Sequence, residues 1–155
     1  MVIVTMGEKC SYSLLFKQLS IAFENNLQRE AAQYGLTAAQ ANILIFLSKV
    51  DHQVNQRELE SYFHLSNPTV TGLMKRMEAK GFIRREVSRE DGRAKYIILT
   101  EKAMEISSEV QQNMAQMEQK VVQGMAEAEQ EQFHALLLQA LKNIYVCRER
   151  HQQDS

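Results

Sequence analysis

The stretch that most constrains the fold runs from residue 55 to 80, where the sequence predicts two short helices joined by a tight turn. Apolar residues of the first half fall at helical spacing, and they are Leu59, Tyr62, Phe63 and Leu65. Asn55 and Glu58 have the spacing of a capping box, which predicts where this helix begins. The pattern stops near Ser66, which can cap a second helix, and Pro68 is well tolerated in its first turn.

The second helix has an apolar side formed by Val70, Leu73, Met74 and Met77. Its opposite side and flanks carry Asn67, Thr69, Thr71, Gly72, Lys75 and Arg76. A helix that reads the major groove of DNA needs short hydrogen-bonding side chains at its N-terminal end and cationic ones near the phosphates. Glycine inside a helix costs about 1 kcal/mol relative to alanine, so close approach of a sugar-phosphate backbone is one explanation for Gly72. From these residues alone, DNA contact and a helical hairpin whose polar face is only solvated are equally expected.

Beyond this helix the sequence predicts a β-hairpin with a basic tip. Gly81 stops the helix, and residues 82–87 and 95–99 have strand patterns on either side of a turn-rich loop at 88–93. Residues 75–95 contain eight Lys or Arg and four Asp or Glu, a net +4, so the rest of the chain carries −5 to give the total of −1. Charge gathered in this way is typical of a phosphate-binding surface, although a solvated basic surface has the same composition. Helix-turn-helix plus basic hairpin predicts a winged helix-turn-helix.

Four pieces of the chain at this spacing form a specific signal. They are Leu36-Thr37-Ala38-Ala39-Gln40, Pro68-Thr69-Val70-Thr71-Gly72-Leu73, Arg76-Met77-Glu78-Ala79-Lys80-Gly81 and Asp91-Gly92-Arg93-Ala94-Lys95. Together they resemble the MarR family of bacterial transcriptional regulators, over about residues 10 to 148. The resemblance implies a homodimeric repressor that binds a pseudo-palindromic operator in double-stranded DNA and is released by a small ligand or by oxidation. One departure is Ala103, which stands where the family often has glycine.

The resemblance also implies how the chain is divided. Residues 1–155 form a single chain that is mainly α-helical with a small β-hairpin wing. Residues 36–99 are expected to form the winged helix-turn-helix DNA-binding part, and residues 10–34 and 100–150 the dimerisation helices. A small-molecule effector is expected between these parts, near apolar residues such as Tyr12, Phe16, Phe46 and Met104.

Local patterns predict the remaining elements. A helix is expected over residues 11–34, and a short buried helix begins at a second capping box formed by Thr37 and Gln40. Near residues 52–55 a short extended piece can add a third strand to the hairpin, with Val54 facing inward.

Two longer helices are expected after the hairpin. Thr100 is a good N-cap for a helix that runs to about residue 124, and a second helix is expected over residues 126–151. The first has a narrow apolar seam of Val110, Met114, Met117 and Val121. The second has a wider apolar face of Phe133, Leu136, Leu137, Leu141, Ile144 and Tyr145. This apolar surface exceeds what one small winged domain covers, so we expect an obligate dimer with recognition helices about 34 Å apart.

The candidate DNA-binding residues fall in two groups. The helical group is Ser66, Asn67, Pro68, Thr69, Thr71, Gly72, Lys75 and Arg76, and the hairpin group is Arg89, Asp91, Arg93 and Lys95. The short polar side chains can contact base edges, or they can only cap the helix and face solvent. Lys75 and Arg76 are candidates for phosphate contacts, although Arg76 can instead pair with Glu78 or Asp91. Arg93 at the hairpin tip can enter a narrow minor groove, and Asp91 either holds its guanidinium group or is an ordinary turn aspartate.

Cys10 and Cys147 raise a redox hypothesis. A branch of the MarR family senses organic hydroperoxides through a cysteine near the start of the first helix, and Cys10 lies near that place beside Tyr12. Isolated cysteines are more often inert and buried, and Lys9 is the only neighbour that would activate the thiol. The four histidines are not at ligand spacing, so neither a metal site nor a cofactor is expected.

Other classes of function are disfavoured to different degrees. No nucleophile, base and orienting acid occur in a recognisable motif, and there is no glycine-rich phosphate loop, so an enzyme is not expected. A winged helix that binds only other proteins is the alternative to sequence-specific DNA binding. The sequence has no run of about 20 apolar residues and no secretory signal, and its two distant cysteines suit a reducing compartment. We therefore expect a cytoplasmic protein without membrane contact.

Overall fold

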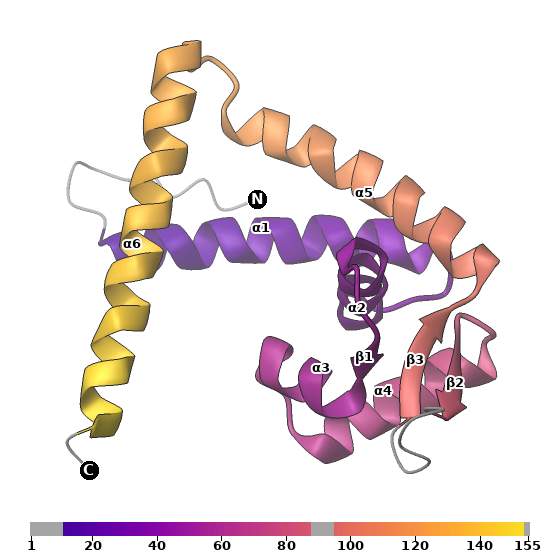
Figure 1. The fold of residues 1–155 in the computed structure, drawn as a ribbon. Helices are drawn as coiled ribbons and strands as arrows, with labels where there is room; N and C mark the ends of the chain where they lie inside the picture. The colour runs from indigo at the N-terminus through magenta and orange to yellow at the C-terminus, as the bar shows by residue number, and fades with distance from the viewer. Residues whose placement is uncertain (1–10, 88–94, 154–155) are drawn as a thin grey trace. The chain divides into compact units, whose positions relative to one another are not determined.

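The computed structural model describes residues 11–87 and 95–153, and the chain divides into two compact units, residues 1–117 and 118–155. The elements in order are α1 (Tyr12–Ala32), α2 (Ala38–Lys49), β1 (Val54–Asn55), α3 (Gln56–Phe63), α4 (Asn67–Ala79), β2 (Ile83–Val87), β3 (Lys95–Leu99), α5 (Glu101–Val121) and α6 (Glu127–Gln153) (Figure 1). The predicted fold class, mainly α with a small β-hairpin, is confirmed. None of the helices in the described ranges combines the length and the apolar content that a bilayer crossing requires.

The sheet has three antiparallel strands in the order β1-β3-β2. β2 and β3 pair along all five residues of each strand, beginning with Ile83 opposite Leu99, which confirms the predicted hairpin. Val54 of β1 lies opposite Ile97 of β3 and is only 1% exposed. The predicted third strand and its inward-facing valine are therefore confirmed.

Two of the predicted helix starts are side-chain caps in the structure. At the start of α2, the Gln40 N–H donates to Thr37 Oγ1 at 3.3 Å and the Thr37 N–H donates to Gln40 Oε1 at 3.0 Å, which completes a capping box. At the start of α5, the Ala103 N–H donates to Thr100 Oγ1 at 3.3 Å. Each cap satisfies an N–H group that has no partner within the helix.

Two helices end earlier than predicted. α1 stops at Ala32 rather than Tyr34, and α5 stops at Val121 rather than near Gly124. In the first case, the Tyr34 N–H bonds at 3.0 Å to a carbonyl three residues back instead of four, so the last turn is tighter than an α-helix. Gly35, at φ +67°, and Gly124, at φ +89°, then turn the chain away.

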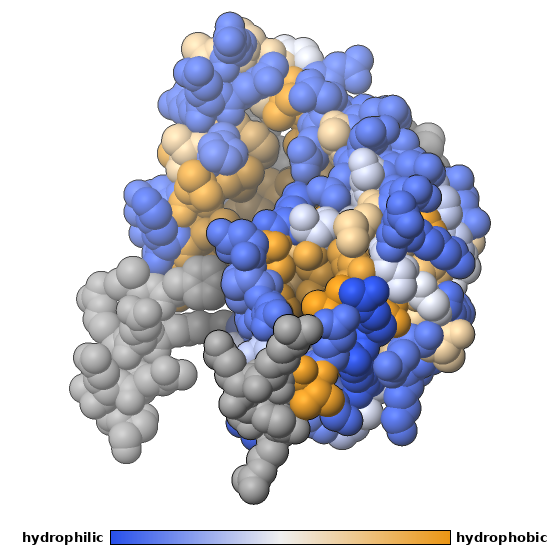
Figure 2. Space-filling model, turned by 45° about the vertical axis from the view of Figure 1, so that its right-hand side comes forward, coloured by the Kyte–Doolittle hydropathy of each residue, from blue (hydrophilic) through white to orange (hydrophobic). Residues whose placement is uncertain are grey.

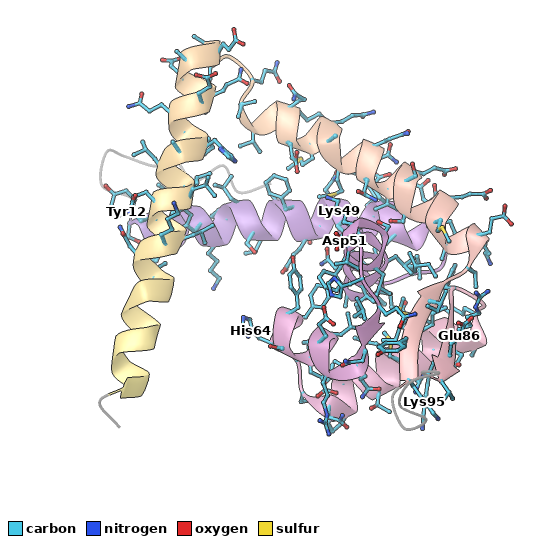
Figure 3. The ribbon with its side chains drawn as sticks, in the orientation of Figure 1. Tyr12, Lys49, Asp51, His64, Glu86 and Lys95 are labelled. Carbon is cyan, nitrogen blue, oxygen red and sulfur yellow. The ribbon has the colours of Figure 1, made fainter. Side chains whose placement is uncertain are left out.

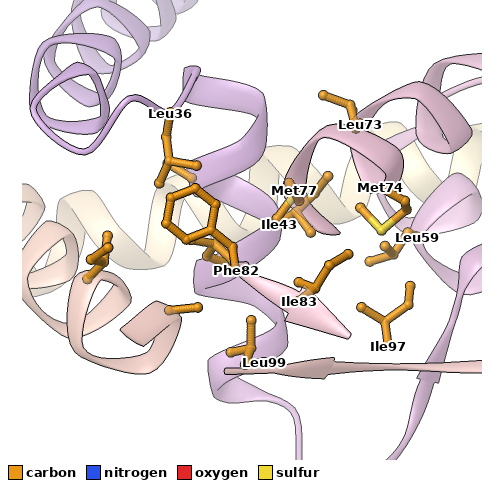
Figure 4. Packing of buried hydrophobic residues seen from close by; sticks show 14 of the residues in the cluster. Leu36, Ile43, Leu59, Leu73, Met74, Met77, Phe82, Ile83, Ile97 and Leu99 are labelled. Carbon is orange, nitrogen blue, oxygen red and sulfur yellow. The ribbon is translucent and has the colours of Figure 1, made fainter. Parts of the chain in front are cut away.

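The core lies where α2, α3, α4 and the sheet meet, and α1 and α5 also contribute buried residues to it (Figure 4). The apolar side of α4 is buried as predicted, and it consists of Val70, Leu73, Met74 and Met77. Other helices, strands and connecting residues contribute further members, among them Leu36, Ile43, Leu59, Phe82, Ile83, Ile97 and Leu99. Burying a side chain of this size contributes roughly 1.5 to 3 kcal/mol. The core therefore fixes the rotation of α4 and turns its opposite side outward.

A hydrogen-bonded turn closes the C-terminal end of α4. The Phe82 N–H donates to the Met77 carbonyl at 2.9 Å and the Gly81 N–H donates to the Glu78 carbonyl at 3.0 Å, the pattern of a Schellman motif. Thr100 joins the same turn, because its N–H donates to the Phe82 carbonyl at 3.0 Å and its hydroxyl donates to the Gly81 carbonyl at 2.8 Å. The end of α4 is thereby held to the starts of β2 and α5.

We predict that Gly81→Ala lowers the free energy of unfolding by about 1 kcal/mol, since residue 81 has φ +71°, a region that side chains disfavour. A Cβ at this position would meet nothing within 4 Å, so the loss comes from the backbone and not from a clash. Urea unfolding of the two proteins measures it. Gly81→Asn should lose less, because asparagine tolerates this conformation. Equal stability of the alanine variant would contradict the prediction.

Candidate nucleic-acid interface

The start of α3 is fixed by two contacts, only one of which was predicted. The Glu58 N–H donates to Asn55 Oδ1 at 3.1 Å, so Asn55 is the N-cap as expected. The reciprocal half of the predicted capping box is not made, because the Glu58 carboxylate instead contacts His52 Nε2 at 2.6 Å. Asp51 Oδ1 lies 3.5 Å from His52 Nδ1. The hydrogen bond and the charge of Glu58, aided by Asp51, raise the pKa of His52 above its usual value.

The turn between α3 and α4 is tight. His64 adopts φ +52°, and the Leu65 N–H bonds back to the Glu60 carbonyl at 3.0 Å. The prediction that the Ser66 side chain caps α4 is wrong, because its hydroxyl pairs with Thr69 Oγ1 at 2.8 Å and makes no capping bond. Pro68 lies in the first turn of α4, as predicted. Figure 3 shows His64 at the end of α3.

The surface of α4 that faces away from the core carries the predicted helical site residues. Pro68, Gly72 and Lys75 follow one another at spacings of four and three residues, so they share the line opposite the buried side. Pro68 and Lys75 are exposed, and Gly72 is half-buried. Asn67 and Thr71 lie on the flank of α4 that contacts α3. The structure therefore brings the helical candidates together on one outward surface.

Two residues of α3 that the sequence did not single out also reach this surface. Gln56 Nε2 donates to Glu60 Oε1 at 3.0 Å and to Thr71 Oγ1 at 2.8 Å. Asn67 Nδ2 donates to the same Glu60 oxygen at 2.7 Å. Gln56 and Glu60 are four residues apart on one face of α3, and this spacing is the only sequence signal for the contact. We call these four side chains, Gln56, Glu60, Asn67 and Thr71, the Glu60 network.

Three of the cations counted in residues 75–95 lie beside an acceptor within the described part of the chain. Lys80 Nζ donates to the Gly35 carbonyl at 2.5 Å, Arg84 Nε lies 2.8 Å from Glu86, and Arg85 Nε lies 3.3 Å from Glu78. Glu78 thus contacts the sheet through Arg85, although the sequence suggested Arg76 as its partner.

The remaining described cations of this segment lie on the surface. Lys75, Arg76 and Lys95 are exposed, and Figure 3 shows Lys95 at the start of β3. The guanidinium group of Arg76 lies over Gly72, with Nη1 3.5 Å from the position that a Cβ would take. The hairpin candidates Arg89, Asp91 and Arg93 lie outside the described residues.

Comparison with known proteins places this arrangement in a family. A family model described as "MarR family" matches residues 34–94. Over 116 residues the chain is 31% identical to the uncharacterized HTH-type transcriptional regulator YwoH of Bacillus subtilis (strain 168), covering 75% of this chain and 82% of that protein. This chain belongs to the MarR family.

Solved structures of MarR-family proteins have the same fold. The transcription regulator MarR from Oenococcus oeni PSU-1 is 29% identical, with a TM-score of 0.69 over 85% of this chain and 99% of that chain. MepR of S. aureus, in a crystal structure of its complex with DNA, is 27% identical, with a TM-score of 0.77 over 87% of this chain and 99% of that chain. The predicted winged helix-turn-helix fold of a transcriptional regulator is therefore confirmed.

This MarR-family chain also has a pocket of about 740 Å³ between the end of α2, strands β1 and β3, and α5. Its lining includes Leu47, Ser48, Val54, Ile97, Met104, Ser108 and Gln111. Met104 was expected near a ligand. Phe46 instead packs against two other aromatic rings, with centroids 4.2 Å from Tyr62 and 5.7 Å from Phe63.

The redox candidate cannot be placed, since Cys10 and the side chain of Cys147 lie outside the described part of the chain. Among the residues that are described, no group of three or more His, Cys, Asp or Glu side chains could hold a metal ion.

We predict a pH-dependent contribution of His52 to stability. Its pKa is raised in the folded protein, so the charged pair with Glu58 stabilises the fold fully below the unfolded pKa of about 6.5 and ceases to do so as pH rises through the folded value. His52→Gln should therefore lower the urea midpoint at about pH 5.5 and leave it unchanged at about pH 9. The Glu58→Gln background should abolish this difference. A deficit that is the same at both pH values would contradict the pairing.

Proposed function

We propose that this chain is a transcriptional repressor that binds a pseudo-palindromic operator as a homodimer and is released by a small ligand. The observation that carries the proposal is the outward surface of α4, where hydrogen-bonding and cationic side chains lie opposite a fully packed apolar side. The likeness to MepR, which has been crystallised in a complex with DNA, supports DNA binding by this chain. Binding to other proteins alone is the alternative, and it requires no salt-dependent affinity for DNA.

Asn67, Thr69 and Thr71 would contact base edges from the N-terminal half of α4, while Lys75 and Arg76 would meet phosphates one turn later. Ser66, Pro68 and Gly72 complete the helical contact surface. On the hairpin, Lys95 would contact a phosphate. From the sequence alone we extend the proposal to the tip of the hairpin. There Arg89 would contact a phosphate, and Arg93 would enter the minor groove with Asp91 beside it.

A homodimer is supported by apolar side chains that remain on the surface. On α1, Tyr12 is 80% exposed and Phe16 is 45% exposed, and the same helix exposes Leu14, Leu15, Leu19 and Ile21. Along α6, Leu136, Leu138, Leu141 and Ile144 are exposed. Figure 2 shows apolar side chains at the surface of the face that it draws. Each of these two helices exposes several large apolar side chains to water, so a second copy of the chain is the proposed cover.

Release by a small ligand is supported by the pocket between α2, the sheet and α5. Its volume of about 740 Å³ suits a small molecule, and apolar walls with a few hydroxyl and amide groups are typical of such sites. β1 and β3 line it, and β3 is also a strand of the hairpin. A ligand in this pocket would therefore touch the hairpin that we propose contacts DNA.

Fluorescence anisotropy with duplex from the chain's own upstream region tests the DNA proposal. We expect salt-dependent binding by two chains per site, with preference over a scrambled duplex. Lys75→Ala should weaken binding to both duplexes and reduce the slope of log affinity against log salt by about 0.9 for each phosphate that the variant no longer binds. Lys49→Ala, which removes an exposed lysine from the end of α2, is the control. Absence of binding at low salt would favour the protein-contact alternative.

Gly72→Ala should change stability and DNA affinity in opposite directions. Residue 72 is helical, and an added Cβ would meet only the Arg76 side chain at ordinary contact distance, so alanine should stabilise the fold by about 1 kcal/mol. If the DNA backbone passes close to α4, the same methyl group should weaken binding to every duplex. Urea unfolding and anisotropy on one preparation measure both effects. A gain in stability with unchanged DNA affinity would remove Gly72 from the contact surface.

A further inference from the structure

The atoms that α4 presents outward depend on side chains of α3. In the Glu60 network, one carboxylate oxygen accepts hydrogen bonds from Asn67 Nδ2 at 2.7 Å and from Gln56 Nε2 at 3.0 Å. The same nitrogen of Gln56 reaches Thr71 Oγ1 at 2.8 Å. Three of these side chains are half-buried, and Asn67 is exposed. The network therefore lies along the seam between α3 and α4, at the edge of the outward surface.

The chemistry of Glu60 sets the direction of every hydrogen bond in this network. An ionised carboxylate only accepts, so Gln56 and Asn67 must both turn their NH2 groups toward it. The oxygen and nitrogen of a side-chain amide are hard to tell apart by shape, but here the carboxylate decides which of them faces Glu60. Gln56 uses its two N–H groups on Glu60 and Thr71. The Thr71 oxygen is then an acceptor inside the network, and its hydroxyl hydrogen is left to donate elsewhere.

We propose that Gln56 and Glu60 are positioning residues that set the base preference of the operator by fixing the hydrogen-bonding polarity of Thr71 and Asn67. This inference rests on the proposed DNA-binding function. Gln56 occupies one lone pair of the Thr71 oxygen and leaves the hydroxyl hydrogen free, so Thr71 would favour an acceptor on the major-groove edge, such as guanine O6 or N7, adenine N7 or thymine O4, over the amino group of cytosine. Asn67 keeps one N–H and its oxygen, a donor beside an acceptor, which is the pair that matches N7 and N6 of adenine.

The charge of Glu60 supports this role. A carboxylate close to a DNA-facing surface weakens the general attraction to phosphates, so Glu60 would not increase the affinity for DNA. A carboxylate at the N-terminal end of α4, where Asn67 is the first helical residue, is also favoured by the helix dipole. The group therefore fits an orienting function that does not depend on contact with DNA.

The test is selection from a pool of randomised duplexes by the full-length chain, followed by anisotropy on the preferred duplex and its single-base variants. Gln56→Ala should reduce discrimination at one base pair of each half-site by about tenfold, and Glu60→Ala should do so at a neighbouring pair. Affinity for a scrambled duplex should stay unchanged in Gln56→Ala. The matched control is Gln33→Ala, which removes a glutamine that also donates to a glutamate, Glu30 at 3.1 Å, but at the end of α1.

Two further variants separate positioning from a structural role. Glu60→Gln keeps the volume but can donate as well as accept, so it should relax the base preference while binding all duplexes more tightly. In a Thr71→Val background, Gln56→Ala should cause no further loss of discrimination at the base pair that it affects in the wild type, because the two residues act through one contact. Should an alanine variant fail to fold by circular dichroism, Gln56→Met keeps the volume, removes the donors and should give the same loss.

The outcomes distinguish this inference from the proposed function. A wild-type chain that selects no sequence overturns both. A wild-type chain that selects a sequence, while Gln56→Ala or Gln56→Met and Glu60→Ala keep the same base preferences, overturns this inference alone. Additive effects of Gln56→Ala and Thr71→Val at the same base pair would also overturn it.

Discussion

The burial of one side of α4 is the constraint on which the rest of the interface depends. Val70, Met74 and Met77 are fully buried at helical spacing, so rotating α4 by one residue, about 100°, would expose part of this set and bury a neighbour such as Lys75. Each buried side chain is worth roughly 1.5 to 3 kcal/mol, and an unpaired buried lysine costs more than that. Burial of these residues therefore determines which residues of α4 face outward.

The two ends of α4 carry this orientation into the neighbouring elements. At its N-terminal end, the bond from Leu65 to Glu60 closes α3 and starts the tight turn. At its C-terminal end, Phe82 is 2% exposed and belongs to the core, while its backbone bonds to Met77 and Thr100. A single buried residue therefore joins α4, the hairpin and the start of α5. The start of α5 is therefore bonded to the residue that closes α4, and both α5 and β3 line the pocket between α2, the sheet and α5.

Features set by short-range rules could be predicted from the sequence. The capping box of Thr37 and Gln40, the cap at Thr100 and the inward Val54 all depend on spacing or alternation within a few residues, and the structure contains each of them. The family resemblance was likewise visible in ordered motifs, and the matching relatives confirm it.

The predictions failed where a side chain had a choice of partner. Ser66 and Glu58 have the right spacing to cap, but Thr69 and His52 compete for the same hydroxyl and carboxylate groups. The contact of Gln56 with Thr71 joins residues 15 positions apart on two helices, and no periodicity encodes such a pair, because it depends on the angle at which α3 and α4 meet.

Counting charges along the sequence yields the net charge of residues 75–95 but not which cations lie beside a partner, for a similar reason. Arg84 and Arg85 each lie beside a carboxylate, and such pairs have little effect beyond a Debye length of about 8 to 10 Å. Lys80 donates to a backbone carbonyl but is exposed and keeps its charge, while Lys75, Arg76 and Lys95 are exposed and form no ion pair with another described residue. In the proposed interface these cations would meet phosphates, while the polar side chains of α4 would discriminate among duplexes. Because such side chains select a base only when donor and acceptor are held in fixed places, the packing between α3 and α4 matters for binding as much as for stability.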